Sequence, residues 1–398
     1  MKGPTFFLLA GEPSGDFIGA HLMKALKQKY GKGLRIIGIG GPQMEKEGLQ
    51  SLVPMKSLSV IGITEIIPQA LGLLKKIRET ADFIKKEKPD AVITIDLPAF
   101  SFRLGKKLKE TGIPHIHYGA PTVWAWRPRR ARMISKFLTH LLTLFPFEPP
   151  YFTKHGLPTT FVGDPVLEAG FDQGHGEAFR KRHNIPKDAV LLCMLPGSRK
   201  SEVSQLAPIF ADTVRKLQRQ FPKLHIVIPT VSNVSHMIGS LTKDITCPSV
   251  IITHETEKAD AFAASDVALA ASGSVALELA CAQLPMVITY KASMLTFWIV
   301  QRMIKVPYAC MINILLNRSV IPEYLQENCE PEKLSRAIST LLTDKALRQK
   351  QVQGLKKAKE LLKSKEELPS VQAANVIGDI IGGDGKRFLS ITRKDVRL

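Results

Sequence analysis

Three carboxylates stand where short apolar runs of the chain end. Asp96 directly follows the run 91–95, while Glu12 and Asp16 lie just beyond the run 5–10. Open α/β sheets bind ligands at the carboxyl ends of their strands, so a carboxylate there can serve as a general base. The same residues can equally cap the next helix. We therefore take Asp96 as the candidate catalytic base, with Glu12 and Asp16 as rivals.

The segment that holds Glu12 and Asp16 also contains Ser14 and Gly15. Glycine lets the backbone approach a ligand closely, and a helix that starts here would favour an anion. A tight turn in which Ser14 or Asp16 caps the helix explains the same residues. The loop is not a GxGxxG motif, so its spacing alone is a weak signal.

A second loop with ligand-binding residue types follows the apolar run 189–195. It carries Gly197, Ser198 and Arg199. Backbone N–H groups at a helix start, together with a guanidinium, can hold a diphosphate. An ordinary turn with exposed charges is the alternative.

A third loop follows the run 267–270 and holds Ser272, Gly273 and Ser274, with Glu278 one helical turn later. The serine hydroxyls can donate to phosphate, and a carboxylate at that depth can accept hydrogen bonds from a ribose. A capped helix with a solvated glutamate is the alternative. Further along, Asn313 stands between apolar residues, where an amide needs partners; a buried structural asparagine accounts for it.

Two of the three tryptophans, Trp124 and Trp126, are followed by Arg127, Arg129 and Arg130. Tryptophan supplies apolar area, and arginine makes forked contacts with phosphate. This segment indicates a phosphate-bearing ligand with apolar bulk, or else a strand end with core aromatics and solvated arginines. The segment 60–78 combines Val, Ile and Leu with Lys75, Lys76 and Arg78, as in a helix on anionic lipid or a core-packing helix.

The elements that must position these residues alternate between strand and helix. Apolar runs at 5–10, 34–39, 91–95, 113–118, 141–145 and 160–162 predict strands of one array. The pattern restarts at 189–195 and continues through 225–229, 250–253, 267–270 and 285–289. We therefore predict an α/β fold of two doubly wound, Rossmann-like domains facing a cleft. Expected bounds are 1–169 and 187–345, with 346–398 forming C-terminal helices and a tail that either docks or crosses back to the first domain.

The composition limits the partners. The 398 residues carry a formal net charge of +19, which favours an anionic nucleic acid, membrane surface or phosphorylated substrate. Five cysteines without a CxxC pair fit reduced thiols in a cytoplasmic protein and predict no metal site. We expect no signal peptide and no transmembrane helix, because no apolar run is long enough.

Taken in order, these motifs resemble the lipid-A-disaccharide synthase family of GT-B glycosyltransferases. The resemblance spans roughly residues 6–345. It is carried by the segments 11–16, 38–42, 118–127, 195–199, 272–278 and 305–313, and Trp-Ala-Trp-Arg at 124–127 is the most distinctive of them.

The resemblance implies an inverting transfer from UDP-2,3-diacylglucosamine to 2,3-diacylglucosamine 1-phosphate. The products would be a β-1,6-linked disaccharide 1-phosphate and UDP, with no metal or other cofactor. The nucleotide would lie in the second domain, on Arg199, Glu278 and Asn313 with the loops 197–199 and 272–274. The acceptor would lie against the first domain, on Ser14, Gly15, Trp124, Trp126 and Arg127. A cytoplasmic enzyme on the anionic inner membrane surface is implied, and a homodimer is left open.

The chain departs from the family at Pro13, at Gly119-Ala120 and at Ala99, where a second carboxylate is frequent. These changes bear on acyl-chain preference and acceptor fit, and Ala99 leaves Asp96 as the only carboxylate of its loop. Two other enzymatic functions remain open: a GT-B enzyme with a soluble acceptor and an epimerase acting on a UDP-sugar. A non-catalytic membrane scaffold is disfavoured by the presence of Arg199, Glu278 and Asn313. Nucleic-acid binding is disfavoured by an aromatic content of 7%, because single-strand binders stack bases on aromatic side chains.

Overall fold

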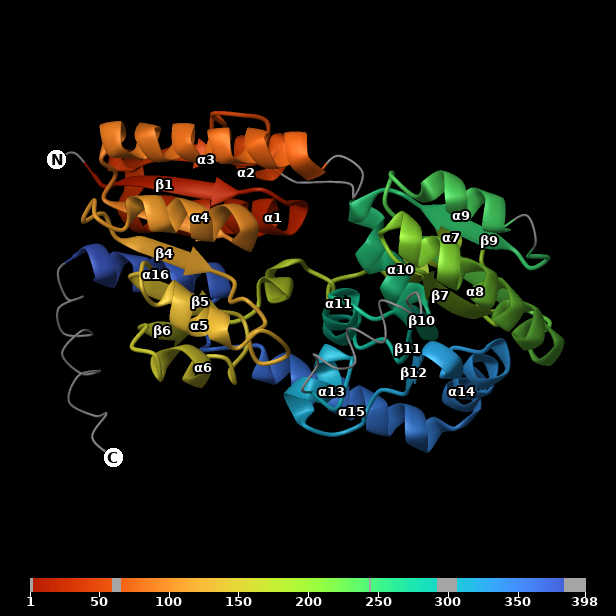
Figure 1. Cartoon of the computed structure of the whole chain (residues 1–398). Helices are drawn as coiled ribbons and strands as arrows, with labels where there is room; N and C mark the ends of the chain where they lie inside the picture. The colour runs from red at the N-terminus through yellow and green to blue at the C-terminus, as the bar shows by residue number, and fades with distance from the viewer. Residues whose placement is uncertain (1–2, 59–65, 243–244, 292–305, 383–398) are drawn as a thin grey trace. The chain divides into compact units, whose positions relative to one another are not determined.

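The computed structural model describes residues 3–58, 66–242, 245–291 and 306–382. The chain folds into two compact units, each built on a parallel sheet (Figure 1). The first unit comprises Met1–Glu168 and Leu362–Leu398, and the second comprises Ala169–Leu361. The predicted class of two parallel α/β domains is confirmed.

The first unit contains a six-stranded sheet in the order β2-β1-β3-β4-β5-β6, with every pair parallel. Its strands are β1 (Thr5–Ala10), β2 (Arg35–Ile39), β3 (Ala91–Ile95), β4 (His115–Tyr118), β5 (His140–Thr143) and β6 (Thr159–Phe161). Its helices are α1 (Pro13–Tyr30), α2 (Pro42–Lys46), α3 (Ile66–Glu87), α4 (Pro98–Leu108), α5 (Arg129–Ile134), α6 (Pro150–Thr153) and α16 (Pro369–Ile381), with 3-10 turns η1 (Gly31–Gly33), η2 (Met55–Ser57) and η3 (Pro165–Glu168).

Strand β1 is buried on both faces, as its continuous apolar sequence predicts. Phe6 and Leu8 point into the cluster formed with α1 and α16, while Phe7 and Leu9 point into the cluster formed with α3 and α4. This alternation follows from the two-residue repeat of a strand. Helices therefore cover both faces of the sheet, and the strand ends are left to carry ligand-binding loops.

The chain returns to the first unit at Leu362. Helix α16 packs against α1, where the Lys29 Nζ lies 2.8 Å from Asn375 Oδ1 and Ile377 is buried. Ser370 donates from its backbone N–H and from its hydroxyl to Glu168, at 2.7 Å each. Helix α15 (Lys345–Leu361), by contrast, belongs to the second unit.

The second unit has a parallel six-stranded sheet in the order β12-β11-β10-β7-β8-β9. Its strands are β7 (Val190–Leu195), β8 (Leu224–Pro229), β9 (Ser249–Ile252), β10 (Val267–Ala271), β11 (Met286–Tyr290) and β12 (Glu323–Leu325). Its other helices are α7 (Gly176–Arg182), α8 (Lys200–Gln220), α9 (Ser235–Thr242), α10 (Lys258–Ala264), α11 (Val275–Cys281), α13 (Met311–Leu316) and α14 (Pro331–Thr343), with 3-10 turns η4 (Glu255–Glu257) and η5 (Gln326–Asn328).

Helix α8 supplies much of the core of this unit. Leu206 and Phe210 pack under Leu192 and Met194 of β7. The helix is continuous through Pro208, which is exposed, so the carbonyl that lacks an N–H partner can be hydrated. The three-residue strand β12 was not predicted, because so short a run carries no periodicity.

Candidate functional site

Both sheets reverse their strand order at one point. In the first sheet β1 lies between β2 and β3, and in the second sheet β7 lies between β8 and β10. Ligands of open α/β sheets bind beyond the carboxyl ends of the strands at such a switch point. The loops that follow β1, β3, β7 and β10 are the ones that hold Glu12, Asp96, Arg199 and Ser272.

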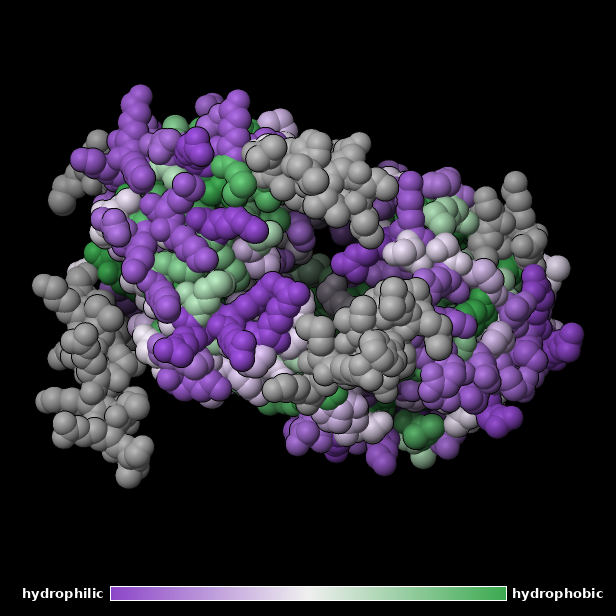
Figure 2. Space-filling model, viewed as in Figure 1, coloured by the Kyte–Doolittle hydropathy of each residue, from purple (hydrophilic) through white to green (hydrophobic). Residues whose placement is uncertain are grey.

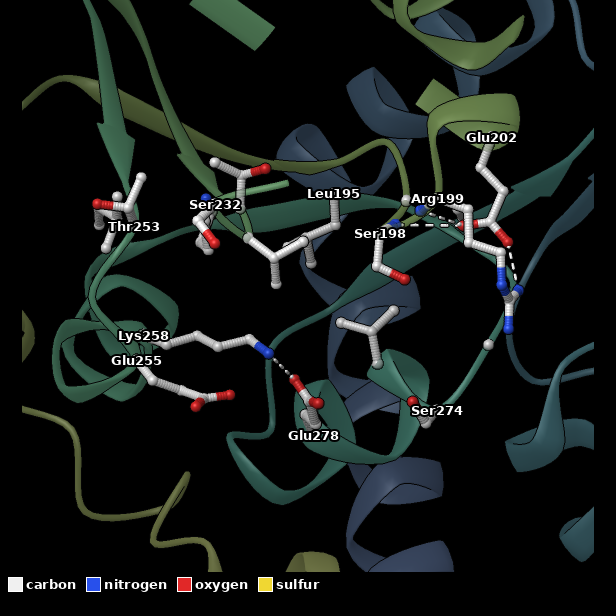
Figure 3. A pocket seen from close by; sticks show the side chains of 18 of the residues that line it. Leu195, Ser198, Arg199, Glu202, Ser232, Thr253, Glu255, Lys258, Ser274 and Glu278 are labelled. Carbon is white, nitrogen blue, oxygen red and sulfur yellow. Dashed lines mark hydrogen bonds and ion pairs between the residues drawn. The ribbon is translucent and has the colours of Figure 1, made fainter. Parts of the chain in front are cut away.

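In the second unit a pocket of about 510 Å³ opens at this edge (Figure 3). Its size suits a small organic ligand. All but one of the residues predicted to bind nucleotide line it: Gly197, Ser198, Arg199, Ser272, Gly273, Ser274 and Glu278. Sequence reasoning missed other lining residues, notably Glu202, Thr253, Glu255 and Lys258. Glu202 lies three residues beyond Arg199 on α8, whereas the other three come from the segment after β9 and reach the loops of β7 and β10 only through the fold.

One wall of the pocket is a loop whose hydrogen-bond donors converge on Glu202. The Glu202 Oε2 accepts the backbone N–H of Ser198 at 3.1 Å and of Arg199 at 3.3 Å, and Arg199 Nη1 lies 2.7 Å from Oε1. The Glu202 side chain is 14% exposed and that of Arg199 is 78% exposed. Gly197 has φ +118°, and a Cβ there would lie 2.7 Å from Glu202 Oε2. A carboxylate thus occupies the donors that were predicted to hold a diphosphate.

The opposite wall carries a second ion pair, in which Lys258 of α10 and Glu278 of α11 point toward each other (Figure 3). The Lys258 Nζ lies 2.5 Å from Glu278 Oε2, and both side chains are 19% exposed. No sequence motif indicates this pair, because its members are twenty positions apart on different helices.

Asn313, the remaining predicted nucleotide ligand, is fully buried and does not line the pocket. Its Nδ2 donates to Ile321 O at 2.8 Å and to Glu323 Oε1 at 2.6 Å, and its Oδ1 accepts the N–H groups of Val320 and Ile321. The structure therefore uses the amide to hold backbone. Glu323 also accepts the Ala309 N–H, and the Ser272 hydroxyl donates to Ala309 O, so Asn313 reaches the pocket only through other residues.

At the edge of the first sheet, Asp96 ends β3 in a strained conformation. Asp96 has φ +50° and Leu97 has φ +51°, two successive non-glycine residues in the left-handed region. Such strain clusters at functional sites. The Tyr118 carbonyl accepts the Asp96 N–H at 2.9 Å, and the Ser101 hydroxyl donates to Asp96 O at 2.9 Å. Burial raises the pKa of the Asp96 carboxyl above its usual range, which a bond from the Leu97 N–H partly offsets.

The conformation of Leu97 explains two further features. Leu97 is the N-cap of α4, and Pro98 occupies the first helical position, which favours helix initiation. The helix therefore starts at Pro98. The Leu97 side chain also lies over Gly11, where a Cβ would approach Leu97 Cδ2 to 2.2 Å. This contact joins the loop after β1 to the loop after β3.

The loop after β1 separates its two carboxylates. Glu12 and Ser14 are exposed, whereas Gly15 and Asp16 are buried. The Asp16 carboxylate accepts backbone N–H groups of Gly41, Gln43 and Met44 at 2.8–3.0 Å. It thereby caps α2, so its oxygens are engaged with backbone while the catalytic roles of Asp16 and Asp96 stay predictions.

The two tryptophans also have different environments. Trp124 is buried, and its Nε1 donates to Glu148 Oε1 at 3.1 Å. Trp126 is partly exposed, with the guanidinium carbons of Arg127 and Arg130 at 4.4 and 5.2 Å from its ring centroid. Arg127 has φ +52°, so a third strained residue lies at this edge.

Two buried carboxyls of the first unit escaped prediction. Glu148 accepts the N–H groups of Leu144 and Phe145 as well as the Trp124 indole N–H, yet burial raises its pKa to about 7. Burial likewise raises the pKa of Asp164 to about 6. Neither residue follows an apolar run of strand length directly, which is why the sequence pattern did not mark them.

Solved structures define the fold class. The chain resembles an S. aureus MnaA–UDP structure (TM-score 0.64, 14% identity, 95% of this chain and 97% of that chain). It also resembles Acinetobacter baumannii MurG (TM-score 0.58, 14% identity, 94% and 99%). With WaaG, a glycosyltransferase of lipopolysaccharide biosynthesis, the TM-score is 0.56 at 13% identity, over 95% and 100%. The fold is that of the GT-B glycosyltransferases.

Sequence comparison identifies the family. Residues 6–377 match the family model described as lipid-A-disaccharide synthetase. The chain is 45% identical to lipid-A-disaccharide synthase of Rhodospirillum centenum over 96% of each chain. It is 45% identical to that of Paramagnetospirillum magneticum, over 94% of this chain and 97% of the relative. The chain belongs to the lipid-A-disaccharide synthase family, and its activity is that of a glycosyltransferase of lipid A biosynthesis.

None of the helices in the described ranges is long and apolar enough to cross a membrane. Among the same residues, no group of three or more His, Cys, Asp or Glu side chains is arranged to hold a metal ion.

Proposed function

We propose that the chain transfers the sugar of UDP-2,3-diacylglucosamine to 2,3-diacylglucosamine 1-phosphate, with inversion at the anomeric carbon. The acceptor hydroxyl forms the new bond to that carbon, the bond to the UDP oxygen breaks, and a base takes the hydroxyl proton. The products are a β-1,6-linked disaccharide 1-phosphate and UDP. The observation that carries the proposal is that seven predicted nucleotide residues line one pocket of the second unit.

In that pocket Arg199 and the N–H groups of its loop would bind the diphosphate and neutralise the charge that develops as UDP leaves. The Ser272 and Ser274 hydroxyls would donate to the same phosphates, with Gly273 leaving room between them. Glu278 would accept hydrogen bonds from the ribose hydroxyls. Asn313 would act indirectly, because it bonds Glu323, which accepts the N–H of Ala309, whose carbonyl accepts the Ser272 hydroxyl.

Asp96 is the base that we favour. A general base works best when its pKa lies near the operating pH, and burial shifts the Asp96 carboxyl in that direction. Its strained backbone fixes its place at the switch point of the first sheet. Glu12 remains a rival because it is exposed on the adjoining loop, whereas Asp16 is committed to capping α2.

The acceptor would lie on the first unit. Trp126 and Arg127 offer a ring and a guanidinium side by side for the sugar and its phosphate. Trp124 is buried and would act indirectly, because its hydrogen bond to Glu148 fixes the loop that carries Trp126 and Arg127. Ser14 and Gly15 would lie beside the acceptor at the end of β1.

We further propose that the protein works in the cytoplasm against the anionic face of the inner membrane. The net charge of +19 and the largely hydrophilic face in Figure 2 favour attraction to anionic lipid rather than insertion. Helix α3 carries residues 66–78 of the predicted lipid-facing segment, and residues 60–65 of it lie outside the described residues. We expect no nucleic-acid partner and no cofactor, and a homodimer remains open.

The test is UDP release by purified protein in detergent, with each lipid alone and with both together. Release that needs both lipids supports the transferase. Release of UDP without the acceptor, or none across several acyl lengths, would contradict it. Asp96→Ala serves as the catalytic control, and product analysis by mass spectrometry shows whether the disaccharide forms.

A further inference from the structure

Lys258 is the one lysine among the described residues that line the pocket, and its ammonium is held on several sides. Its ammonium lies 5.5 Å from the ring centroid of Phe171 and 5.9 Å from that of Phe262, and the two rings lie 5.6 Å apart. Lysine normally keeps its head group in water. Here the side chain is only 19% exposed, and the ammonium ends on Glu278.

The pair leaves the two oxygens of Glu278 in different states. Oε2 is buried and lies 2.5 Å from the Lys258 Nζ. The ion pair is made through Oε2, so Oε1 lies outside it. A carboxylate with one oxygen fixed by a cation keeps the other in a defined direction as an acceptor, and only acceptors can recognise hydroxyl donors.

A purely stabilising ion pair does not account for this arrangement well. Partly buried pairs offer little net stability, because both charges lose hydration when they meet. The pair also faces the pocket rather than packing within the core, and Figure 3 shows the lysine reaching across the pocket wall toward Glu278. Its location points to a role toward the ligand.

We propose that Lys258 is a positioning residue that holds Glu278 for the ribose hydroxyls, so that the pair sets the preference of the pocket for ribonucleoside diphosphates. The inference rests on the proposed nucleotide site. It adds Lys258 to that site and assigns the site a preference for ribose over deoxyribose. Lys258 acts through Glu278 and need not touch the nucleotide itself.

The experiment measures the binding of UDP, 2′-deoxy-UDP and 3′-deoxy-UDP by calorimetry. The variants are Lys258→Met, Glu278→Gln and the double variant, in the full chain. Methionine keeps the apolar stem between the two rings and removes the charge. Lys216→Met is the matched control, because Lys216 makes an exposed pair with Glu332, at 2.6 Å, that does not line the pocket.

The wild type should bind UDP about tenfold more tightly than at least one of the deoxy analogues, as expected for a hydrogen bond to a charged group. Lys258→Met should weaken UDP binding about tenfold. The same substitution should hardly change the affinity for the deoxy analogue that the wild type disfavours, so the preference for UDP over that analogue largely disappears. The double variant should be no weaker than Glu278→Gln alone, because residues that act as a unit are not additive. Lys216→Met should leave all three affinities unchanged.

Equal weakening of UDP and both analogues by Lys258→Met would overturn the inference, as would additive effects in the double variant. The ratio of affinities is a property of the folded molecules, so partial unfolding of a variant does not mimic the expected result. Lys258→Arg, which keeps a cation, should retain at least part of the preference. A wild type that binds UDP but does not discriminate would overturn the inference alone, whereas a wild type that does not bind UDP would overturn the proposed nucleotide site as well.

Discussion

At the edge of the first sheet Asp96, Leu97 and Arg127 all hold left-handed backbone conformations, whereas the loop after β7 in the second sheet uses Gly197 for the same purpose. The first edge holds non-glycine residues in strained backbone conformations, which fixes where their side chains lie. The second places its charges in ion pairs around an open pocket, and a ligand can exchange with the partners of such pairs.

The largest expected effect is on the strained edge. Asp96→Asn should lower the turnover rate by about 10²–10⁴-fold, the usual contribution of a general base. The affinity for UDP should stay within about twofold, because the nucleotide pocket lies in the other unit. Steady-state rates and UDP calorimetry check this. An Asn variant that keeps more than a tenth of the activity would move the base to Glu12.

The second prediction concerns Asn313, which holds backbone next to the pocket of the second unit. Asn313→Ala leaves the N–H groups of Val320 and Ile321 without their acceptor, and each unsatisfied buried group costs about 1–3 kcal/mol. The free energy of unfolding should fall by about 3 kcal/mol, measured by urea denaturation. UDP affinity of the folded variant should fall by less than about threefold. Lost UDP binding with unchanged stability would instead show that Asn313 contacts the nucleotide.

The third prediction is a pH dependence confined to the first unit. The pKa of Glu148 is raised from 4.5 to about 7, so the folded state favours the neutral acid. The associated stability is fully present below pH 4.5 and is lost as the pH rises through 7, about 3 kcal/mol in all. In Glu148→Gln this part of the dependence should vanish when unfolding at pH 5 and pH 8 is compared.

Asp164 provides the internal comparison for that measurement. Its pKa is raised from 3.8 to about 6, so its contribution to the free energy of unfolding is lost as the pH rises through 6. Asp164→Asn should remove that part of the pH dependence of stability. If both variants keep the slope of the wild type, the buried carboxyls do not titrate as their environment implies.

The smallest expected effect is on UDP affinity and comes from Glu202, which bonds the loop after β7. Glu202 occupies the donors that a diphosphate needs, so Glu202→Gln should tighten UDP binding about fivefold by removing a like charge near the phosphates. Uridine, which has no phosphate, should bind as before. Asp212→Asn is the matched control, because Asp212 pairs with Arg215 three residues later on the same helix and is exposed. Weaker UDP binding in Glu202→Gln would show that the carboxylate supports the loop instead of competing with the ligand.

The sequence predicted the edges better than the environments of their residues. Apolar runs followed by glycine, serine or a carboxylate located the loops after β1, β3, β7 and β10, because the strand period and the switch-point rule act locally. Whether Asp16 caps α2 or Asp96 is strained depends on distant backbone, which one sequence does not show. Lys258 was missed for the same reason, since its partner is on another helix. The four hydrogen bonds that hold Asn313 also depend on backbone and a carboxylate outside its own helix, so the sequence left both interpretations of this residue open.

The return of the chain to the first unit has a consequence for biosynthesis. The second unit is in effect an insertion between Glu168 and Leu362, so a ribosome finishes it while the first unit still lacks α16. Until then the faces of α1 that bury Ile377 and its neighbours are open to solvent. The first unit to begin synthesis is thus the last to be completed, and a chain that stops at residue 361 would expose an apolar strip that invites association with other nascent chains.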